Sequence, residues 1–253
     1  MIMKSFQIAG RTAIVTGCNT GLGQGMALAL AQAGADIVGV NQGAAPETMA
    51  QVQALGRKFL DIQRDLSDTS SLSGIVEEAL TLNGRVDILV NNAGIIRRED
   101  AINFSENDWD DVVNLNLKNV FFLAQAVARQ FIAQGTGGKI VNIASMLSFQ
   151  GGVRVPSYTA SKSGVMGITR ALANEWAKHG INVNAIAPGY MATANTAALQ
   201  ADPVRNAAIL DRIPAGRWGS PADLAGPVVF LASPASDYVN GYTVAVDGGW
   251  LAR

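Results

Sequence analysis

Short runs of apolar and β-branched residues alternate along the chain with longer segments whose apolar positions recur at helical spacing. Several of the short runs are apolar almost throughout, as in parallel strands that helices cover on both faces. This alternation predicts an α/β fold, a doubly wound parallel sheet with helices on both faces. The expected strands are Thr12–Thr16, Asp36–Val40, Phe59–Gln63, Val86–Val90, Lys139–Ile143, Ile181–Ile186 and Tyr242–Val246.

The intervening segments predict helices, two of which have well-marked starts. Ser105 followed by Glu106-Asn107-Asp108 fits a capping box, and Ser220-Pro221 offers an N-cap followed by proline at the first helical position. We expect a single domain over residues 1–253, with a substrate-covering insert around 190–217 where the alternation is interrupted. The expected helices are Leu22–Ala33, Glu47–Leu55, Leu72–Leu82, Trp109–Gln134, Tyr158–Lys178 and Pro221–Leu231.

Composition narrows the class of protein. The 253 residues carry a net charge of −1 without a block of like charges, which argues against nucleic acid or an anionic membrane as a partner. A single cysteine, Cys18, excludes an intramolecular disulfide, and with one histidine we expect no metal site. The sequence shows neither a signal peptide nor an apolar run of membrane-spanning length. We therefore expect a cytoplasmic protein.

The first strand runs into a glycine-rich turn, Thr16–Gly23, and then into the first helix. Glycines allow the backbone to approach a pyrophosphate, and the helix N-terminus offers N–H groups to an anion. The spacing is G-x-x-x-G-x-G instead of the common G-x-G-x-x-G, but it follows the first strand of a βαβ unit. The turn predicts a dinucleotide site built by Gly17, Asn19, Thr20, Gly21, Leu22 and Gly23.

The end of the second strand bears on which dinucleotide is bound. An acidic residue there would bind the adenosine ribose of NAD, and this chain has Asn41. The amide can still hydrogen-bond the ribose hydroxyls, but it cannot repel the 2′-phosphate of NADP. No arginine or lysine lies in the glycine-rich turn or directly after Asn41 to pair with that phosphate. These residues favour NAD, although Asn41 as an ordinary loop residue is the alternative.

Two further strand ends carry polar residues. Asp65-Leu66 follows the third strand, where a carboxylate can accept from an adenine amino group. The alternative is that Asp65 starts a helix, a role for which Asp68 competes. Asn91-Asn92-Ala93-Gly94 follows the fourth strand, at the carboxyl edge where ligands bind in such sheets. An ordinary turn is the alternative for these residues.

Tyr158 and Lys162 are four residues apart in a predicted helix, so their side chains share a face, and Ser145 precedes the tyrosine by thirteen residues. An ammonium beside a phenol favours the phenolate and lowers a tyrosine pKa from its reference value of about 10. Such a tyrosine can exchange a proton with an alcohol oxygen that a serine hydroxyl holds. With a dinucleotide as hydride carrier, the trio predicts alcohol/carbonyl interconversion. A surface helix pair is the alternative.

In chain order, these motifs resemble those of the short-chain dehydrogenase/reductase family over essentially the whole sequence. The resemblance implies a Rossmann-type fold with a seven-stranded sheet, a nicotinamide cofactor, and a tetramer or dimer. Tyr158 then resembles the general acid/base, Lys162 lowers its pKa and binds the nicotinamide ribose, Ser145 orients the substrate oxygen, and Asn116 completes a water relay to Lys162. Asn116 lies within a helical pattern, where an asparagine fits a local kink. The motifs are Thr16–Gly23, Asp65, Asn91–Gly94, Asn116, Ser145, Tyr158, Lys162 and Pro188-Gly189, with Met191 and Thr193 as further implied cofactor contacts.

Less generic segments resemble family members that act on deoxy-sugar acids in pectin breakdown, and imply an NAD-dependent oxidoreductase that assembles as a homotetramer. A sugar-acid substrate needs a cation for its carboxylate. Arg154 is our leading candidate, ahead of Arg97 and Arg98, which could instead pair with Glu99 and Asp100. Gln150 and Ser148 could meet substrate hydroxyls. The segments are Arg97–Asp100, Asp108–Asp111, Ser145–Gly152, Arg154–Tyr158 and Gly249–Arg253.

Two other functions remain open. One is an NADPH-dependent ketoreductase of the same family that acts on another carbonyl substrate. The other is a protein that binds NAD as a sensor without turnover, against which the complete set of Ser145, Tyr158, Lys162 and Asn116 argues. The large apolar residues Trp250 and Leu251 near the end of the sequence predict a subunit contact.

Overall fold

The computed structural model describes residues 2–253, apart from the side chain of Ser73. Seven parallel strands form one sheet in the order β3-β2-β1-β4-β5-β6-β7. The predicted sheet is confirmed: the bounds of β1 and β3 are as predicted, and the ends of the other strands differ from prediction by at most two residues. The order reverses between β1 and β4, which creates a crevice at their carboxyl ends. The strands are β1 (Thr12–Thr16), β2 (Asp36–Asn41), β3 (Phe59–Gln63), β4 (Ile88–Asn91), β5 (Gly138–Ile143), β6 (Ile181–Pro188) and β7 (Thr243–Val246).

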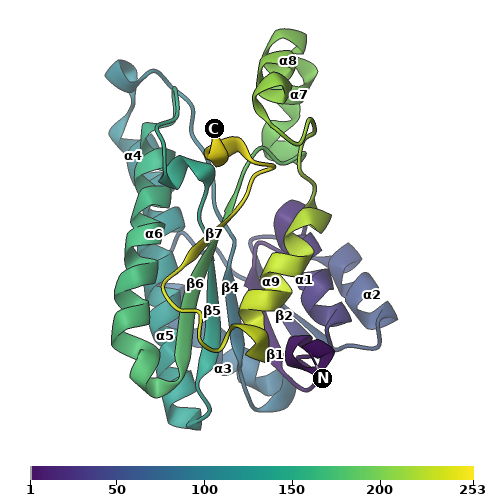
Figure 1. Ribbon diagram of the computed structural model, residues 1–253. Helices are drawn as coiled ribbons and strands as arrows, with labels where there is room; N and C mark the ends of the chain where they lie inside the picture. Colours follow the sequence, from purple (N-terminus) through teal and green to yellow (C-terminus); the bar gives the residue numbers. More distant parts are fainter. Residues whose placement is uncertain (1) are drawn as a thin grey trace.

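Helices cover both faces of the sheet (Figure 1). Those of one face pack beside α1, and those of the other pack beside α5 and α6. Two helices of the predicted insert, α7 and α8, stand above the carboxyl ends of the strands (Figure 1). The first face has α1 (Gly21–Gln32), α2 (Pro46–Ala54) and α9 (Ala225–Ala232); the second has α3 (Leu72–Asn83), α4 (Glu106–Val113), α5 (Asn119–Gln134) and α6 (Pro156–Trp176); the insert has α7 (Ala197–Ala201) and α8 (Pro203–Arg212).

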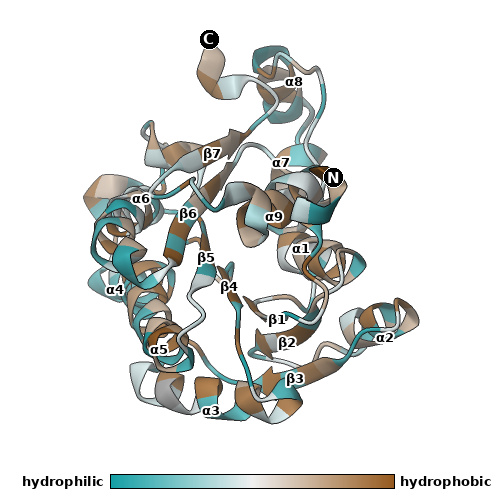
Figure 2. Ribbon diagram, turned by 60° about the horizontal axis from the view of Figure 1, so that its bottom comes forward, coloured by the Kyte–Doolittle hydropathy of each residue, from teal (hydrophilic) through white to brown (hydrophobic). Residues whose placement is uncertain are grey.

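Each face of the sheet buries its own apolar core. Along β1, Ala13 and Val15 join the core under α1 and α9, whereas Ile14 joins the core under α3, α5 and α6. Figure 2 shows the apolar strands enclosed between these helical layers. At the centre of the sheet β1 and β4 are buried along their whole length, and each large apolar side chain contributes about 1.5–3 kcal/mol by its burial.

The predicted helix Trp109–Gln134 is interrupted. α4 ends at Val113, residues Asn114–Lys118 form a π-helical turn, and α5 follows. Within the wide turn, Asn116 Oδ1 accepts from the backbone N–H of Ile95 at 2.9 Å, and its Nδ2 donates to the Ile95 carbonyl at 2.8 Å. The expected local distortion at Asn116 is confirmed. The two hydrogen bonds of Asn116 join the helix to the loop that follows β4.

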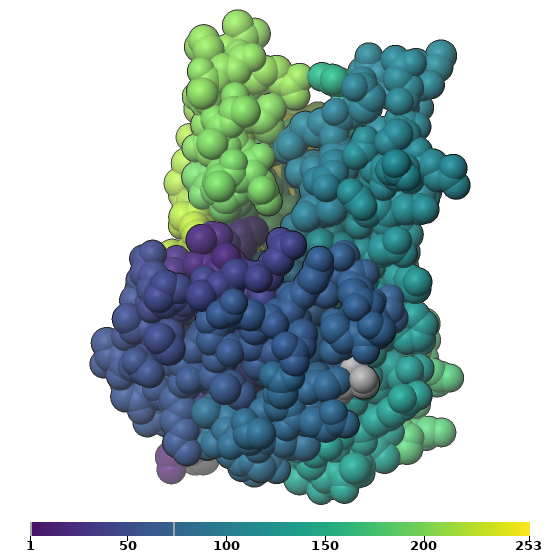
Figure 3. All heavy atoms as spheres, turned by 180° about the vertical axis from the view of Figure 1, so that it is seen from behind, coloured from purple at the N-terminus to yellow at the C-terminus, as the bar shows by residue number. Residues whose placement is uncertain are grey.

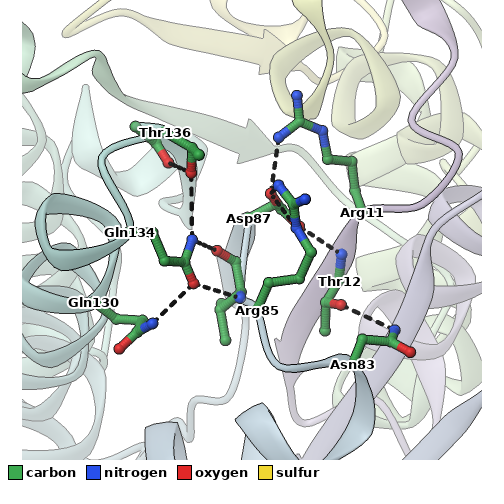
Figure 4. Close-up of polar contacts among 10 residues, drawn as sticks. Arg11, Thr12, Asn83, Arg85, Asp87, Gln130, Gln134 and Thr136 are labelled. Carbon is green, nitrogen blue, oxygen red and sulfur yellow. Dashed lines mark hydrogen bonds and ion pairs between the residues drawn. The ribbon is translucent and has the colours of Figure 1, made fainter.

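The amino-terminal edge of the sheet is held by the buried carboxylate of Asp87, directly before β4 (Figure 4). Its oxygens accept from the Thr12 N–H at 2.9 Å, from Arg11 at 2.8 Å, and from Arg85. Burial opposes ionisation, but these hydrogen bonds hold the pKa of Asp87 below its usual value. The polar groups of this edge satisfy one another, so chemistry is expected at the opposite, carboxyl edge.

Candidate active site

The carboxyl ends of the strands open into a cleft. In the space-filling view, the insert forms one column, in green, and the loop after β4 with its following helix forms a second, in blue and teal (Figure 3). A hollow separates the two columns above the body of the molecule (Figure 3). The reversal of strand order between β1 and β4 lies at the base of this region, where α/β sheets bind ligands.

The glycine-rich turn after β1 fits a pyrophosphate. Gly17 and Gly21 have φ values of 64° and 60°, which favour glycine. A Cβ on Gly23 would lie 2.1 Å from the Gly17 carbonyl oxygen, so that position admits no side chain. A Cβ on Gly21 would meet only Thr193, at 4.0 Å, so the backbone here faces open space. This cradle at the N-terminus of α1 is suited to an anion.

Hydrogen bonds join this turn to the segment after β4. Thr16 Oγ1 accepts from the N–H groups of Asn92 and Ala93, both at 2.9 Å. Asn92 Nδ2 donates to the carbonyls of Thr16 and Gly17, both at 3.0 Å. A Cβ on Gly94 would lie 3.0 Å from Asn116 Oδ1, so small residues are required here. The two predicted cofactor segments therefore lie side by side.

Asn41, at the end of β2, is buried and fully engaged with protein groups on its acceptor side. Its Oδ1 accepts from the N–H groups of Cys18 at 2.7 Å and Asn19 at 3.1 Å. Its Nδ2 donates to Asp61 Oδ1 at 3.2 Å. The side chain thus shapes the glycine-rich turn, and one amide hydrogen remains for a ligand.

Asp65 and Leu66 lie in a tight turn after β3. Asp65 Oδ1 accepts from the Ser67 N–H at 2.9 Å and from the Ser67 hydroxyl at 2.7 Å. Asp68 caps the next helical turn by accepting from the Ser70 N–H. At the start of α5, Asn119 donates to the Leu66 carbonyl at 2.6 Å and so fixes this turn to the helix that packs beside α3. Sequence reasoning missed Asn119, because it falls inside the predicted helix Trp109–Gln134, where nothing in the sequence shows that its side chain reaches a neighbouring turn.

Ser145, Tyr158 and Lys162 lie together where β5 ends and α6 begins. Ser145 follows β5 and caps the short turn Met146–Ser148 by accepting from the Leu147 N–H at 3.1 Å. Lys162 Nζ lies 5.7 Å from the centroid of the Tyr158 ring and donates to the Ile143 carbonyl at 2.6 Å. The serine Oγ accepts a backbone hydrogen bond and keeps its own hydrogen for another oxygen.

The pKa values of this group differ from the sequence-based expectation. Burial raises the pKa of Tyr158 above its usual value, while the hydrogen bond with Ser145 and the charge of Arg98 act to lower it. Burial also lowers the pKa of Lys162 to about 8. We expected Lys162 to lower the pKa of Tyr158. In the structure Lys162 is itself desolvated and hydrogen-bonded to a carbonyl, and the charge that lowers the pKa of Tyr158 is that of Arg98.

The three candidate arginines have different surroundings. Arg154 pairs with Asp100 at 2.9 Å and with Glu99 at 3.6 Å, and its carbonyl accepts from the Glu99 N–H. It is also the one non-glycine residue between 2 and 253 with a positive φ, 64°. Arg97 pairs with Asp108 and Asp111. Arg98, by contrast, donates to the Asn195 carbonyl in the insert at 3.2 Å. Within residues 2–253 no carboxylate oxygen lies within 4.0 Å of its guanidinium.

The far side of the cleft is formed by the segment after β6. A Cβ on Gly189, after Pro188, would lie 2.6 Å from the Cα of Asp247, so the backbones are in close contact. Met191 is buried, and its carbonyl accepts from the Thr196 hydroxyl at 2.6 Å. Thr193 begins the short helical turn Ala194–Thr196 and faces Gly21 across the cleft.

Comparison with known proteins agrees with this geometry. A family model described as Enoyl-(Acyl carrier protein) reductase matches residues 17–251. The chain belongs to the short-chain dehydrogenase/reductase family. It is 70% identical over 253 residues to 2-dehydro-3-deoxy-D-gluconate 5-dehydrogenase of Escherichia coli (strain K12), and 71% identical to the protein of that name from Dickeya dadantii (strain 3937), with 100% of every chain covered. Among solved structures, a presumed 2-deoxy-D-gluconate 3-dehydrogenase from Agrobacterium tumefaciens with bound NADP is 55% identical, with a TM-score of 0.92, 98% of this chain covered and 99% of that chain.

The resemblance drawn from the sequence is thereby confirmed, as is the fold class. In this short-chain dehydrogenase, Gln150 is half-exposed after the Met146–Ser148 turn. The Ser148 hydroxyl donates to the Lys162 carbonyl at 2.6 Å and is committed to the protein. Of the three candidate arginines, Arg98 is the one without a carboxylate partner within residues 2–253, and Asn119 is the residue that the structure adds to the site.

Proposed function

We propose that this chain is an NAD-dependent dehydrogenase that interconverts a secondary alcohol and a ketone on a deoxy-sugar acid, the class of substrate in the name of its E. coli and D. dadantii relatives. The main support for this proposal is that Ser145, Tyr158 and Lys162 lie together beside the glycine-rich turn, in a chain that matches those relatives over its whole length. A nicotinamide bound along this edge would accept or donate the hydride.

The residues then divide the proton chemistry among them. The Ser145 hydroxyl, whose oxygen accepts from Leu147, donates its hydrogen to the substrate oxygen. Tyr158 removes the hydroxyl proton when the alcohol is oxidised, and returns it when the ketone is reduced. Lys162 passes the proton on toward solvent. Because the Asn116 amide is engaged with Ile95, we assign its part in this relay to its backbone carbonyl.

The tyrosine assignment is tested by Tyr158→Phe, which removes the exchangeable proton and keeps the ring. Turnover of a deoxy-sugar acid with NAD, followed at the NADH absorbance band, should fall below about one-thousandth of wild type. NADH binding, measured by fluorescence, should change little. Tyr238→Phe is the matched control, since Tyr238 is fully exposed. Turnover by Tyr158→Phe near the wild-type rate contradicts the mechanism.

We propose Arg98, and not Arg154, as the contact for the substrate carboxylate. Arg154 already pairs with two carboxylates, whereas the charge of Arg98 is unpaired among the described residues and acts on Tyr158. A charge-assisted hydrogen bond contributes about 1.5–3 kcal/mol. Arg98→Gln should therefore lower kcat/KM for the sugar acid by about 10- to 150-fold, and that for a neutral ketone by much less. An equal loss for both substrates contradicts the assignment, and Arg97→Gln is the control.

The cofactor has a second candidate, because the A. tumefaciens structure contains NADP. The turn Gly17–Gly23 and residues 41–45 contain no arginine or lysine, which supports NAD. Dissociation constants of NADH and NADPH, measured by fluorescence titration of the purified protein, decide between them. Tighter binding of NADPH would select the second candidate, an NADPH-dependent ketoreductase.

We further propose a cytoplasmic homotetramer that acts in the breakdown of pectin-derived sugar acids. Residues 2–253 contain no helix that is both long and apolar enough to cross a membrane. Support for assembly comes from exposed apolar side chains, Phe122 and Ile132 on α5 and Tyr242 before β7. Trp250 is not part of this surface: it is buried in its own chain against Tyr190, which corrects our expectation for it. Sedimentation as a monomer at micromolar concentration contradicts the proposal.

A further inference from the structure

A carboxylate on β3 lies against the end of β2, at the corner where the adenosine half of a dinucleotide is expected. Asp61 is half-buried; its Oδ1 accepts from Asn41 Nδ2 at 3.2 Å and its Oδ2 accepts from the Ala45 N–H at 3.0 Å. No arginine, lysine or histidine nitrogen within residues 2–253 lies within 4.0 Å of it. Its negative charge adds to the effect of burial in raising the pKa of the neighbouring Cys18 thiol to about 12.

Asp61 determines which way the Asn41 amide points. A carboxylate accepts only, so the amide nitrogen of Asn41 must face it and the amide oxygen must face the other way. That oxygen then accepts from Cys18 and Asn19 in the glycine-rich turn. Gly39 makes room for this arrangement, since a Cβ there would lie 3.1 Å from Asn41 Nδ2. The anionic group at this corner is therefore supplied by β3, from behind a neutral residue at the end of β2.

Asp61 also occupies the positive end of α2. Ala45 is the N-cap of that helix, and its N–H donates to Asp61. Helix N-termini attract anions through their free N–H groups and dipole. A 2′-phosphate near Asn41 would find this donor taken and a negative charge in its place. The neighbouring loop, residues 42–45, has no cation to compensate.

We propose that Asp61 is a specificity-determining residue that disfavours the 2′-phosphate of NADP(H), and that it replaces in this role the acidic residue absent from position 41. The inference rests on the proposed function only in requiring that the chain bind a nicotinamide dinucleotide. Its mechanism is charge repulsion, so the preference should weaken as salt increases.

The test is binding, not turnover. NADH and NADPH are titrated by fluorescence into wild type and Asp61→Asn, which keeps the size of the side chain and one acceptor oxygen. Wild type should bind NADH more tightly, and Asp61→Asn should lower the ratio of the NADPH to the NADH dissociation constant about tenfold, or about 1.4 kcal/mol. The NADH constant should change less than about threefold, and the gain should shrink at high salt.

Asp36→Asn is the matched control. Asp36 is the first residue of β2, the strand that pairs with β3, and it accepts from the Lys58 N–H and from Asn83 at the amino-terminal edge of the sheet. It should leave the ratio unchanged. Gln42→Arg is a second variant, at an exposed position whose side chain makes no hydrogen bond within residues 2–253. It should also lower the ratio, which locates the phosphate at this corner if Asp61→Asn proves unstable in a thermal melt.

The outcomes are distinguishable. Failure of wild type to bind either dinucleotide overturns the proposed function and the inference with it. Binding of both with an unchanged ratio in Asp61→Asn, or an equal loss of both affinities, overturns the inference alone. A wild type that binds NADPH as tightly as NADH does the same.

Discussion

Replacing Asn41 by aspartate would restore the acidic residue that commonly binds the adenosine ribose, yet the structure predicts that the change destabilises this chain. The new carboxylate could still accept from the Cys18 and Asn19 N–H groups. Its other oxygen would replace Nδ2, which lies 3.2 Å from Asp61 Oδ1. Two carboxylates at that separation cannot both stay ionised without a large cost.

The magnitude follows from two limits. Coulomb repulsion between unit charges 3.2 Å apart is about 5 kcal/mol at an effective dielectric constant of about 20. Protonating one carboxyl, with a reference pKa of about 3.9, costs about 4 kcal/mol at pH 7 and about 1.5 kcal/mol at pH 5. Protonation costs less than repulsion, so the two carboxyls share one proton. The loss in free energy of unfolding at pH 7 is therefore at most about 4 kcal/mol. For a chain of this size that lowers Tm by about 8–16 °C.

The same shared proton determines how the stability of Asn41→Asp changes with pH. The folded variant holds a proton that the unfolded chain releases above about pH 4, so stability falls as pH rises from there to the raised pKa of the pair. We expect the difference in Tm between wild type and Asn41→Asp, measured by calorimetry, to be small at pH 5 and large at pH 7.5.

Two variants control for other causes. Asn41→Ala loses the hydrogen bonds to the glycine-rich turn, which the aspartate can keep, but its penalty in stability should not vary with pH in this range. The double variant Asn41→Asp/Asp61→Asn exchanges the partners and should recover most of the lost stability. A pH-independent penalty for Asn41→Asp, or no recovery in the double variant, would refute the reasoning.

Three further predictions concern single residues. Lys162 is buried and its pKa is lowered to about 8, so its charge destabilises the folded state below pH 8, and this cost disappears between pH 8 and about 10.5. Lys162→Met should therefore abolish turnover yet raise the free energy of unfolding at pH 7 by at most about 3 kcal/mol, with a smaller gain at pH 10. The gain should appear as a higher Tm. Gly23→Ala places a Cβ 2.1 Å from the Gly17 carbonyl oxygen and should abolish NADH binding, measured by fluorescence. Gly167→Ala in α6 is the control, since no atom lies within 4 Å of the added Cβ. It should bind NADH normally and gain about 0.5–1 kcal/mol in free energy of unfolding, measured by denaturant titration. His179→Gln, at an exposed helix end, should keep kcat within about threefold of wild type, and a thousand-fold loss would give His179 a catalytic role.

Much of the fold was predictable because its signals are local. A parallel strand buried on both faces is apolar along most of its length, so β1 is visible in the sequence without knowledge of its neighbours. The helix break at Asn116 was also expected, since an asparagine side chain competes for backbone groups. The insert was predicted only as an interruption, because the short helices α7 and α8 lack the long apolar period that identifies a helix.

Part of the candidate site was likewise predictable from the sequence, and part was not. Ser145, Tyr158, Lys162 and the glycine-rich turn were predicted from residue type and spacing, because their chemistry requires those side chains at those positions. The sequence by itself thus determined the fold class and the reaction type. Only the tertiary structure decided which charges remain available: Arg154 is paired with Glu99 and Asp100, Arg98 reaches the insert, and Asp61 stands behind Asn41. The physical reason is that a charge acts through the groups around it in space, and those groups come from strands and loops far apart in the chain.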